Sequence, residues 1–357
     1  MKYKEFYKGK KVLITGHTGF KGAWMCHVLN LLGAQVYGYA LQPPTTPSLY
    51  ELSQVSKYIT SEFGDIRDLT HLQDFFTRVQ PEIVIHMAAQ PIVRESYKSP
   101  VYTYEVNVMG TVNVLECIRN TPSVKSFVNV TTDKVYKNRE LDRGYREEEE
   151  LNGYDPYSNS KSCSELVTDS YKNSFFLDGS VAISTVRAGN VIGGGDFAKD
   201  RIIPDCLRAI EARTGIAIRN PYSIRPYQHV LEPVFAYLMI AMWQYEDRKY
   251  VGNYNVGPDE EGCLTTGELV EKFCQIWNQQ NNDGLCWHQE SDIGPHEANF
   301  LKLDCTKLKQ TFGWKPRWNA IQMLEKTVEW MSIYRKNGDV REVMVRQMEE
   351  YCGERNN

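Results

Sequence analysis

Long apolar segments are missing from this chain of 357 residues. No run approaches the roughly 20 consecutive apolar residues that a membrane-spanning helix needs. The first eleven residues are polar and basic, and they lack the apolar core of a secretory signal peptide. We therefore expect no membrane association and a cytoplasmic location.

Paired cysteines and an excess of basic residues are missing as well. The nine cysteines are scattered and never spaced as Cys-x-x-Cys, so we expect reduced thiols and neither a disulfide framework nor a metal site. The formal net charge of −4 leaves no basic excess for binding nucleic acid. The length does suit a full α/β domain with a second, smaller lobe, because single cores stop growing near ~250–300 residues.

The segment Lys10–Gly38 combines a strand, a glycine turn and a helix. An apolar run over Lys11–Thr15 predicts a buried strand, apolar residues at helical spacing follow the glycines, and Gln35–Ala40 predicts a second strand. The glycines of the turn are three residues apart, in Gly16-His17-Thr18-Gly19-Phe20-Lys21-Gly22. Such a unit binds pyrophosphate, because glycines let the backbone approach the phosphates and the helix N-terminus offers unpaired N–H groups.

A carboxylate is missing where a dinucleotide site usually has one. Asp or Glu at the end of the second strand accepts hydrogen bonds from the adenosine ribose. The candidates here are Ala40, Leu41 and Gln42, and no arginine nearby favours a 2′-phosphate. The residues alone therefore leave NAD and NADP open.

Alternating strands and helices predict an α/β fold with a doubly wound, parallel Rossmann sheet. A glycine-rich segment at 188–196 marks the first passage into a smaller, interleaved C-terminal α/β lobe. We predict a larger domain of residues 1–189 and 226–257 and a smaller lobe of residues 190–225 and 258–357. The expected elements are strands over 59–65, 82–90, 126–130 and 181–187, and helices from Asp68, over 102–119 and over 157–176.

Tyr157 and Lys161 are four residues apart in a predicted helix and therefore share one face. Tyrosine has a pKa near ~10, and a neighbouring ammonium together with a cationic nicotinamide ring would lower it. Tyr157 would then accept a proton from a sugar hydroxyl, and Thr132, at the end of a predicted strand, would hydrogen-bond the same hydroxyl.

Taken together, these motifs resemble the nucleotide-sugar 4,6-dehydratases of the extended short-chain dehydrogenase/reductases over essentially the whole chain. The resemblance implies an NAD-dependent lyase that oxidises C4, eliminates water across C5–C6 and returns the hydride to C6. The matching residues are Gly16, Gly19, Gly22, Asp65, Ile66, Met87, Ala88, Ala89, Gln90, Asn107, Thr132, Asp133, Lys134, Tyr157 and Lys161.

The same resemblance assigns roles to individual residues. Catalysis falls to Thr132, Asp133, Lys134, Tyr157 and Lys161. Cofactor contacts fall to Gly16, His17, Thr18, Gly19, Phe20, Lys21, Gly22, Asp65, Ile66, Ala88, Ala89, Gln90, Asn107, Tyr157 and Lys161. Substrate contacts fall to Thr132, Asn190, Arg225, His229 and His296, with Arg225 expected at the diphosphate because a guanidinium matches phosphate oxygens.

Lys134 distinguishes this chain from the related dTDP-glucose dehydratases, whose pattern has Glu there as the base for C5. The substitution favours CDP-glucose as the substrate and leaves the identity of the C5 base open. The alternatives are a nucleotide-sugar 4-epimerase, a dehydratase that acts on another NDP or GDP sugar, and a non-catalytic dinucleotide-binding sensor. The resemblance also implies a homodimer or homotetramer and a role in synthesising bacterial O-antigen polysaccharide.

Overall fold

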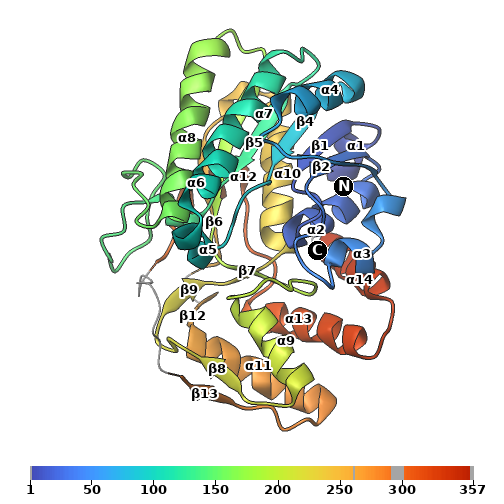
Figure 1. Cartoon of the computed structure of the whole chain (residues 1–357), viewed down its shortest axis with the longest axis vertical. Coiled ribbons are helices and arrows are strands. Elements are labelled where there is room, and N and C mark those ends of the chain that lie inside the picture. Colours follow the sequence, from blue (N-terminus) through green and yellow to red (C-terminus); the bar gives the residue numbers. More distant parts are fainter. Residues whose placement is uncertain (1, 260–261, 291–300, 354–357) are drawn as a thin grey trace.

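The computed structural model describes residues 2–259, 262–290 and 301–353. Its centre is a seven-stranded parallel sheet in the order β11-β6-β5-β4-β1-β2-β3 (Figure 1). These strands are β1 Lys11–Thr15, β2 Gln35–Ala40, β3 Thr60–Phe63, β4 Ile83–His86, β5 Ser126–Val130, β6 Ala182–Ala188 and β11 Asn253–Val256. The predicted α/β class and parallel Rossmann sheet are confirmed.

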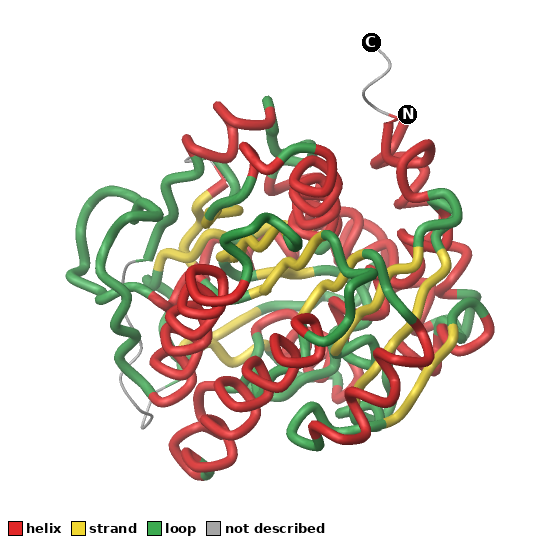
Figure 2. The backbone as a smooth tube through the Cα atoms, turned by 90° about the horizontal axis from the view of Figure 1, so that it is seen from above, coloured by secondary structure: helices red, strands yellow, loops and turns green. Residues whose placement is uncertain are grey.

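Helices cover both faces of the sheet (Figure 2). Alternate side chains of β1 point to opposite faces of the sheet. Val12 and Ile14 therefore pack in the apolar core on one face, and Leu13 packs in the apolar core on the other. The first face carries α1 Lys2–Tyr7, α2 Phe20–Leu31 and α10 Leu231–Glu246. The second face carries α4 Leu69–Val79, α7 Gly110–Arg119 and α8 Pro156–Phe175.

One predicted helix is divided in the structure. We expected a continuous helix over 102–119, but α6 Pro100–Tyr104 and α7 are joined by a π-helical turn over Glu105–Met109. The extra residue in the turn accommodates Asn107, whose buried side chain reaches the loop after β4. The preceding short helix, α5 Val93–Lys98, was not predicted.

The smaller lobe lies below the sheet in Figure 1. Its three short two-stranded sheets pair β7 Val191–Ile192 with β10 Gln228–His229, β8 Ile216–Ile218 with β13 Trp287–Gln289, and β9 Ile224–Pro226 with β12 Cys263–Thr265. Its helices are α9 Ile202–Ala212, α11 Thr266–Asn281 and α13 Ala320–Arg335. Thr265 and Glu268 form a capping box at the start of α11.

The C-terminal helix, α14 Val340–Gly353, returns to the larger domain. The Tyr351 hydroxyl donates to Glu232 of α10 at 2.7 Å, and the Tyr351 ring stacks on Phe235. The predicted domain bounds stay a prediction, but these contacts show that the last helix also covers the larger domain. The remaining described elements are α3 Leu49–Leu52, α12 Thr306–Phe312 and 3-10 turns at Val55–Lys57, Asp133–Val135 and Arg248–Tyr250.

Among the helices of the described residues, none has both the length and the apolar character needed to cross a membrane.

Candidate active site

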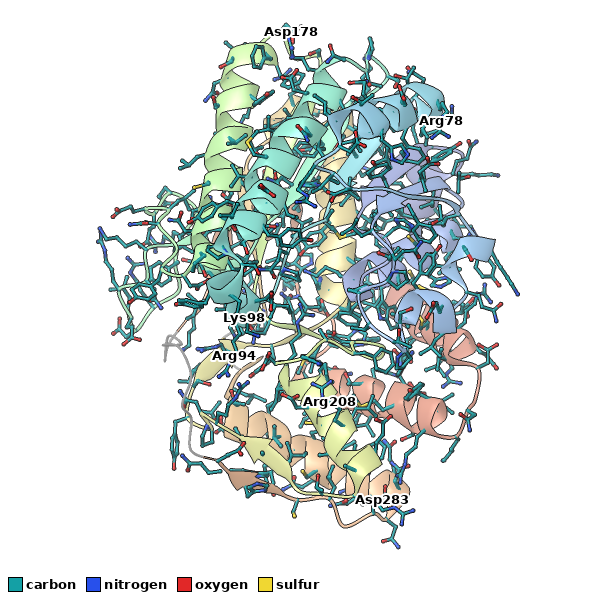
Figure 3. The ribbon with its side chains drawn as sticks, in the orientation of Figure 1. Arg78, Arg94, Lys98, Asp178, Arg208 and Asp283 are labelled. Carbon is teal, nitrogen blue, oxygen red and sulfur yellow. The ribbon has the colours of Figure 1, made fainter. Side chains whose placement is uncertain are left out.

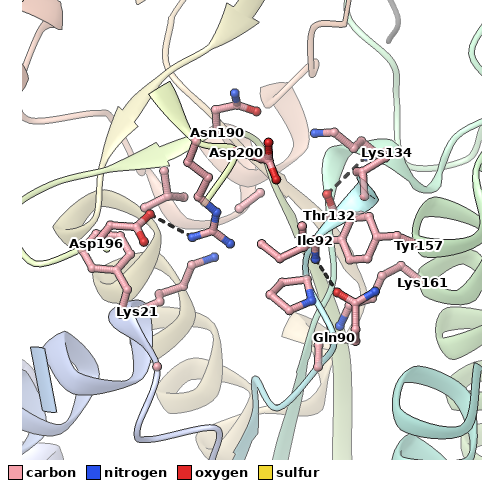
Figure 4. Close-up of a pocket in the computed structure, with 18 of the residues that line it drawn as sticks. Lys21, Gln90, Ile92, Thr132, Lys134, Tyr157, Lys161, Asn190, Asp196 and Asp200 are labelled. Atoms are coloured by element: carbon pink, nitrogen blue, oxygen red, sulfur yellow. Dashed lines mark hydrogen bonds and ion pairs between the residues drawn. The ribbon is translucent and has the colours of Figure 1, made fainter. Parts of the chain in front are cut away.

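A cleft of about 1200 Å³ opens between the carboxyl ends of the sheet and the smaller lobe. The glycine turn after β1, the loop after β4, the turn after β5 and the start of α8 line it from the larger domain. Asn190, Asp196, Arg201 and Arg225 line it from the other side, and Figure 4 shows part of this arrangement. Ligands of open α/β sheets bind at this edge.

The glycine turn has the geometry that a pyrophosphate site requires. Gly16 has φ +82°, and a Cβ there would lie 2.7 Å from the backbone nitrogen of Ala88. A Cβ on Gly22 would collide with the Gly16 carbonyl oxygen. Gly19 is the N-cap of α2 and supplies no capping side chain, so the first N–H groups of this helix face the cleft unblocked. The turn therefore fits a dinucleotide.

Two side chains of this turn have different surroundings. His17 does not line the cleft, because its ring is buried against Gly38 and bonds the Ser61 hydroxyl at 2.7 Å. Lys21 does line the cleft, and its Nζ lies 3.4 Å from the Tyr237 hydroxyl. Burial, followed by repulsion from Arg201 and Lys161, lowers the pKa of Lys21 to about 7.

Asn107 does not line the cleft, but its side chain supports the loop after β4, which does. Its side chain accepts from the Gln90 N–H at 2.8 Å and donates to the Gln90 carbonyl at 3.1 Å. It also donates to Ser160 of α8 at 2.9 Å. Asn107 thus joins the loop after β4 to the helix that carries Tyr157.

Of the other expected cofactor residues, Thr18, Phe20, Asp65, Ile66, Ala88, Ala89 and Gln90 all line the cleft. The Asp65 carboxylate is already bonded to the Arg67 backbone and guanidinium.

Thr132, Asp133 and Lys134 are brought together by a turn. The strand β5 has ended at Val130, and Thr132 caps the 3-10 turn that follows, so all three residues line the cleft. The Thr132 hydroxyl donates to Asp133 Oδ1 at 2.9 Å, and Lys134 Nζ lies 3.2 Å from the same oxygen. Asp133 Oδ2 is buried with no hydrogen-bond partner among the described residues.

Tyr157 and Lys161 face the cleft together, as the sequence predicted. Asp155 caps α8 by accepting from the Ser158 N–H at 3.0 Å, and this capping places Tyr157 in the first turn. Lys161 Nζ donates to the Val130 carbonyl at 3.2 Å, and burial lowers the pKa of Lys161 to about 8.

The effect that we expected Lys161 to have on Tyr157 is not what the structure shows. Burial raises the pKa of Tyr157 to about 12. The influences that oppose burial are a hydrogen bond with Thr132 and the positive charge of Arg201, which the sequence did not single out. Lys161 instead has the Glu165 carboxylate as its main electrostatic partner.

The substrate residues that we predicted divide into three groups. Asn190 and Arg225 line the cleft opposite the larger domain. His229 does not line the cleft. Its ring is buried between those of Trp24 and Trp318, whose centroids lie 5.8 and 4.7 Å away, so the prediction of a substrate contact for His229 is corrected. His296 lies outside the described residues.

Several charged residues of the cleft were missed by sequence reasoning. Arg94 lies at the junction of the two lobes (Figure 3), and its Nε is 3.9 Å from Asp200, which also lies 3.5 Å from Arg219. Asp196 and Arg201 form an ion pair of 2.9 Å on the same wall. No motif signalled these residues, because Asp196, Asp200, Arg201 and Arg219 come from irregular segments of the smaller lobe and Arg94 lies in the short helix α5, which was not predicted.

Comparison with known proteins gives consistent results. The family model described as GDP-mannose 4,6 dehydratase matches residues 13–327. The chain is 47% identical to the CDP-glucose 4,6-dehydratase of Salmonella typhimurium over 98% of both chains. It is 27% identical to the CDP-paratose 2-epimerase of Salmonella typhi, over 90% of this chain and 99% of that one.

Solved structures share the fold. The dTDP-glucose 4,6-dehydratase of Bacillus anthracis in complex with NAD is 21% identical, with a TM-score of 0.76 over 92% of this chain and 97% of that one. A UDP-glucose-4-epimerase from Stenotrophomonas maltophila with bound NAD is 19% identical, with a TM-score of 0.80 over 92% of this chain and 100% of that one.

Proposed function

The chain belongs to the GDP-mannose 4,6 dehydratase family, and on that premise we propose that it is a CDP-glucose 4,6-dehydratase. It converts CDP-glucose to CDP-4-keto-6-deoxyglucose and water. The observation that carries this proposal is the 47% identity to the Salmonella typhimurium enzyme over 98% of this chain. The identity to a dTDP-glucose 4,6-dehydratase, from Haemophilus influenzae, is 24%. The cleft supports it, because Thr132, Tyr157 and Lys161 line one wall.

The cofactor proposed for this cleft is NAD, held by the glycine turn, the N-terminus of α2 and the loop after β4. When bound, it supplies an acceptor for the hydride of C4 and later a donor of hydride to C6. The segment after β2 presents Leu41 and Gln42 to the cleft and no carboxylate, so the preference for NAD over NADP rests on the family.

Tyr157 is the proposed base for the sugar 4-hydroxyl. The Thr132 hydroxyl is proposed to hydrogen-bond the same sugar 4-hydroxyl. A hydrogen bond between Thr132 and Tyr157 keeps the Tyr157 side chain oriented. Lys161 helps to hold the cofactor side of the cleft, since its ammonium is anchored on the Val130 carbonyl.

Asp133 and Lys134 are the proposed groups for elimination. Oδ2 of Asp133, which has no hydrogen-bond partner among the described residues, is available to donate a proton to the leaving 6-hydroxyl. Lys134 is paired with Asp133 and partly exposed, with 30% of its side chain accessible. The role proposed for Lys134 is that of an ammonium that stabilises the enolate at C4–C5, and the alternative role is that of the C5 base.

The assay is incubation of the purified protein with CDP-glucose, followed by detection of a 4-keto-6-deoxy product. A 4-epimerase would give CDP-galactose without loss of water, and a sensor would give no product. Titration calorimetry with NAD and NADP tests the cofactor, and tighter binding of NADP by tenfold, about 1.4 kcal/mol, would contradict the proposal.

We further propose that the enzyme is cytoplasmic, forms homo-oligomers and supplies sugars for O-antigen. The proposed reaction supports the role in O-antigen synthesis, since a 4-keto-6-deoxy sugar nucleotide is a precursor for further sugar-modifying enzymes.

A further inference from the structure

Asp196 and Arg201 form a charged pair for which the proposed mechanism has no role. Both line the cleft, and they lie 2.9 Å apart. The Asp196 side chain is 5% exposed, whereas 35% of the Arg201 side chain is exposed. The carboxylate is therefore held in the protein and the guanidinium reaches the cleft. Figure 4 shows Asp196 on the wall across the cleft from Tyr157.

The loop that carries Asp196 is firmly packed. The Gly194 carbonyl accepts from the Trp24 indole at 3.0 Å, and a Cβ on Gly194 would collide with the Trp330 ring. Gly195 has φ +89° and packs closely against Leu49. Asp196 itself accepts from the Ala198 N–H at 3.1 Å. The direction in which Arg201 points is thus fixed by packing as well as by charge.

The groups that act on Tyr157 come from several elements. From the turn after β5 come Thr132, which bonds it, and Asp133, which disfavours its ionisation. Asp155 at the start of α8 also disfavours ionisation. Tyr237 of α10 is electrostatically coupled to it, Lys21 faces the same cleft, and Lys161 lies one turn along α8. Arg201 is the cation whose charge acts on the Tyr157 hydroxyl.

We propose that Arg201, aimed by Asp196, is a positioning residue that stabilises the Tyr157 phenolate from the wall opposite the larger domain. Arg201 immediately precedes α9, which belongs to the smaller lobe, so the base and its electrostatic partner come from different parts of the fold. Ionisation of Tyr157 then depends on how the smaller lobe is seated over the cleft. The choice of substrate rests on the proposed function, whereas the role of Arg201 concerns the ionisation of Tyr157 and can be tested without turnover.

The first test is the pH dependence of NADH formation in single turnovers of the full-length, NAD-loaded protein with CDP-glucose. Arg201→Met should move the midpoint of this profile upward by about one pH unit, a tenfold change in the ionisation constant. Arg201→Lys keeps the charge and should restore most of the shift. Arg346→Met is the matched control, since Arg346 lies on α14 in an exposed pair with Glu329.

The second test needs no turnover. Tyrosine labelled with ¹³C at Cζ reports each phenol in an NMR titration of the NAD-loaded protein, and the signal absent from Tyr157→Phe identifies Tyr157. Its midpoint should rise in Arg201→Met and not in Arg346→Met.

An unchanged midpoint in Arg201→Met, with only a raised KM for CDP-glucose, would overturn the proposal and make Arg201 a diphosphate contact. If the wild-type protein forms no NADH from CDP-glucose, the proposed function fails, and the NMR midpoint still decides the role of Arg201.

Discussion

Tyr157 is the residue on which the proposed oxidation depends, and its environment makes a direct prediction. Tyr157→Phe removes only the hydroxyl from a buried ring, so the fold and NAD binding should be retained. The transient of NADH after mixing with CDP-glucose should fall at least 100-fold, because general-base catalysis contributes about 10²–10⁴-fold. Stopped-flow absorbance measures it, and a transient at the wild-type rate would exclude Tyr157 as the base.

The pH dependence of the wild-type transient has a definite sign. The pKa of Tyr157 is raised by burial, so the neutral phenol is the main form at pH 7 and the active phenolate increases as the pH rises. Lys161, with a pKa of about 8, is at least half protonated up to pH 8, so its ammonium is largely kept over this interval. We expect the rate of NADH formation to increase from pH 6 to pH 8. A rate that falls over this interval would contradict the proposed base.

Asp133 and Lys134 can be separated by a deuterium label at C5 of the substrate. Asp133→Asn should still form NADH and exchange the label but lose water slowly, because it lacks the acid for the leaving hydroxyl. Lys134→Met should form NADH and retain the label, because no cation stabilises the enolate. Mass spectrometry of the sugar follows both events. Water loss at the wild-type rate in either variant would remove that residue from the mechanism.

Local motifs predicted the residues whose positions depend on their immediate neighbours. Gly16 and Gly22 are required by a tight turn, and Tyr157 and Lys161 share a face because a helix repeats every 3.6 residues. Arg201 escaped prediction, since its place in the cleft depends on packing between Gly194 and Trp330, which are far apart in sequence. His229 was misplaced for the same reason, because nothing local indicates that two tryptophans enclose it.

At the scale of elements, the sheet and α8 are joined by a buried ion pair. Arg187 of β6 bonds Glu165 of α8 through Nε at 2.9 Å and Nη2 at 2.5 Å, and both side chains are at most 1% exposed. Arg187 also donates to the Tyr136 hydroxyl and the Glu147 carbonyl. The pair thus fixes the helix that carries Tyr157 to the strand beside β5.

Arg187→Met should destabilise the protein by about 3–5 kcal/mol, because it leaves the Glu165 carboxylate buried without its partner. Denaturant unfolding measures this change. The double variant Arg187→Met/Glu165→Leu should recover part of the loss, since no charge remains uncompensated. If the double variant were as unstable as the single one, lost packing and not the unpaired charge would explain the effect.

The elements themselves were largely predictable because their apolar patterns are strong. Every strand of the parallel sheet that was expected is present, and Asp68 caps α4 as predicted. The π-helical turn at Glu105–Met109 was not, because no residue type encodes an extra residue in a helical turn. Asn107 lies within this turn, and its hydrogen bonds with Gln90 exist only in the folded chain.

At the scale of the whole molecule, the chain passes between its two lobes more than once. After β7, α9, β8, β9 and β10 of the smaller lobe, the chain returns to the larger domain: α10 packs on the large sheet, and β11 forms its edge beside β6. Helix α14 closes the chain against α10. The glycine-rich segment at 188–196 indicated the first passage. Asn337-Gly338 marks a turn before α14, but no local signal shows that this helix returns to the larger domain. The smaller lobe is therefore connected to the larger domain at several points.

The outer surface of α6, α7 and α8 bears on the proposed oligomer. These helices pack side by side over one face of the sheet (Figure 1). Large apolar side chains on or beside them are exposed: Val101 at 70%, Met109 at 52% and Leu166 at 56%. Apolar residues gathered on adjacent helices are typical of a protein interface. We expect two copies to pair here, which would place each Tyr157 helix near the interface.

If the proposed dimer forms through this surface, Leu166→Glu together with Val101→Asp should convert it to a monomer, because each introduced charge would be buried in an interface around a twofold axis. Sedimentation velocity measures the mass, and circular dichroism checks the fold. The control is Leu177→Glu, which changes another exposed leucine, 76% accessible, beyond the end of α8. A double variant that sediments like the wild-type protein would place the interface elsewhere. If the variant is monomeric, its Tyr157 should also be less active, because α8 would have lost one of the surfaces that hold it in place.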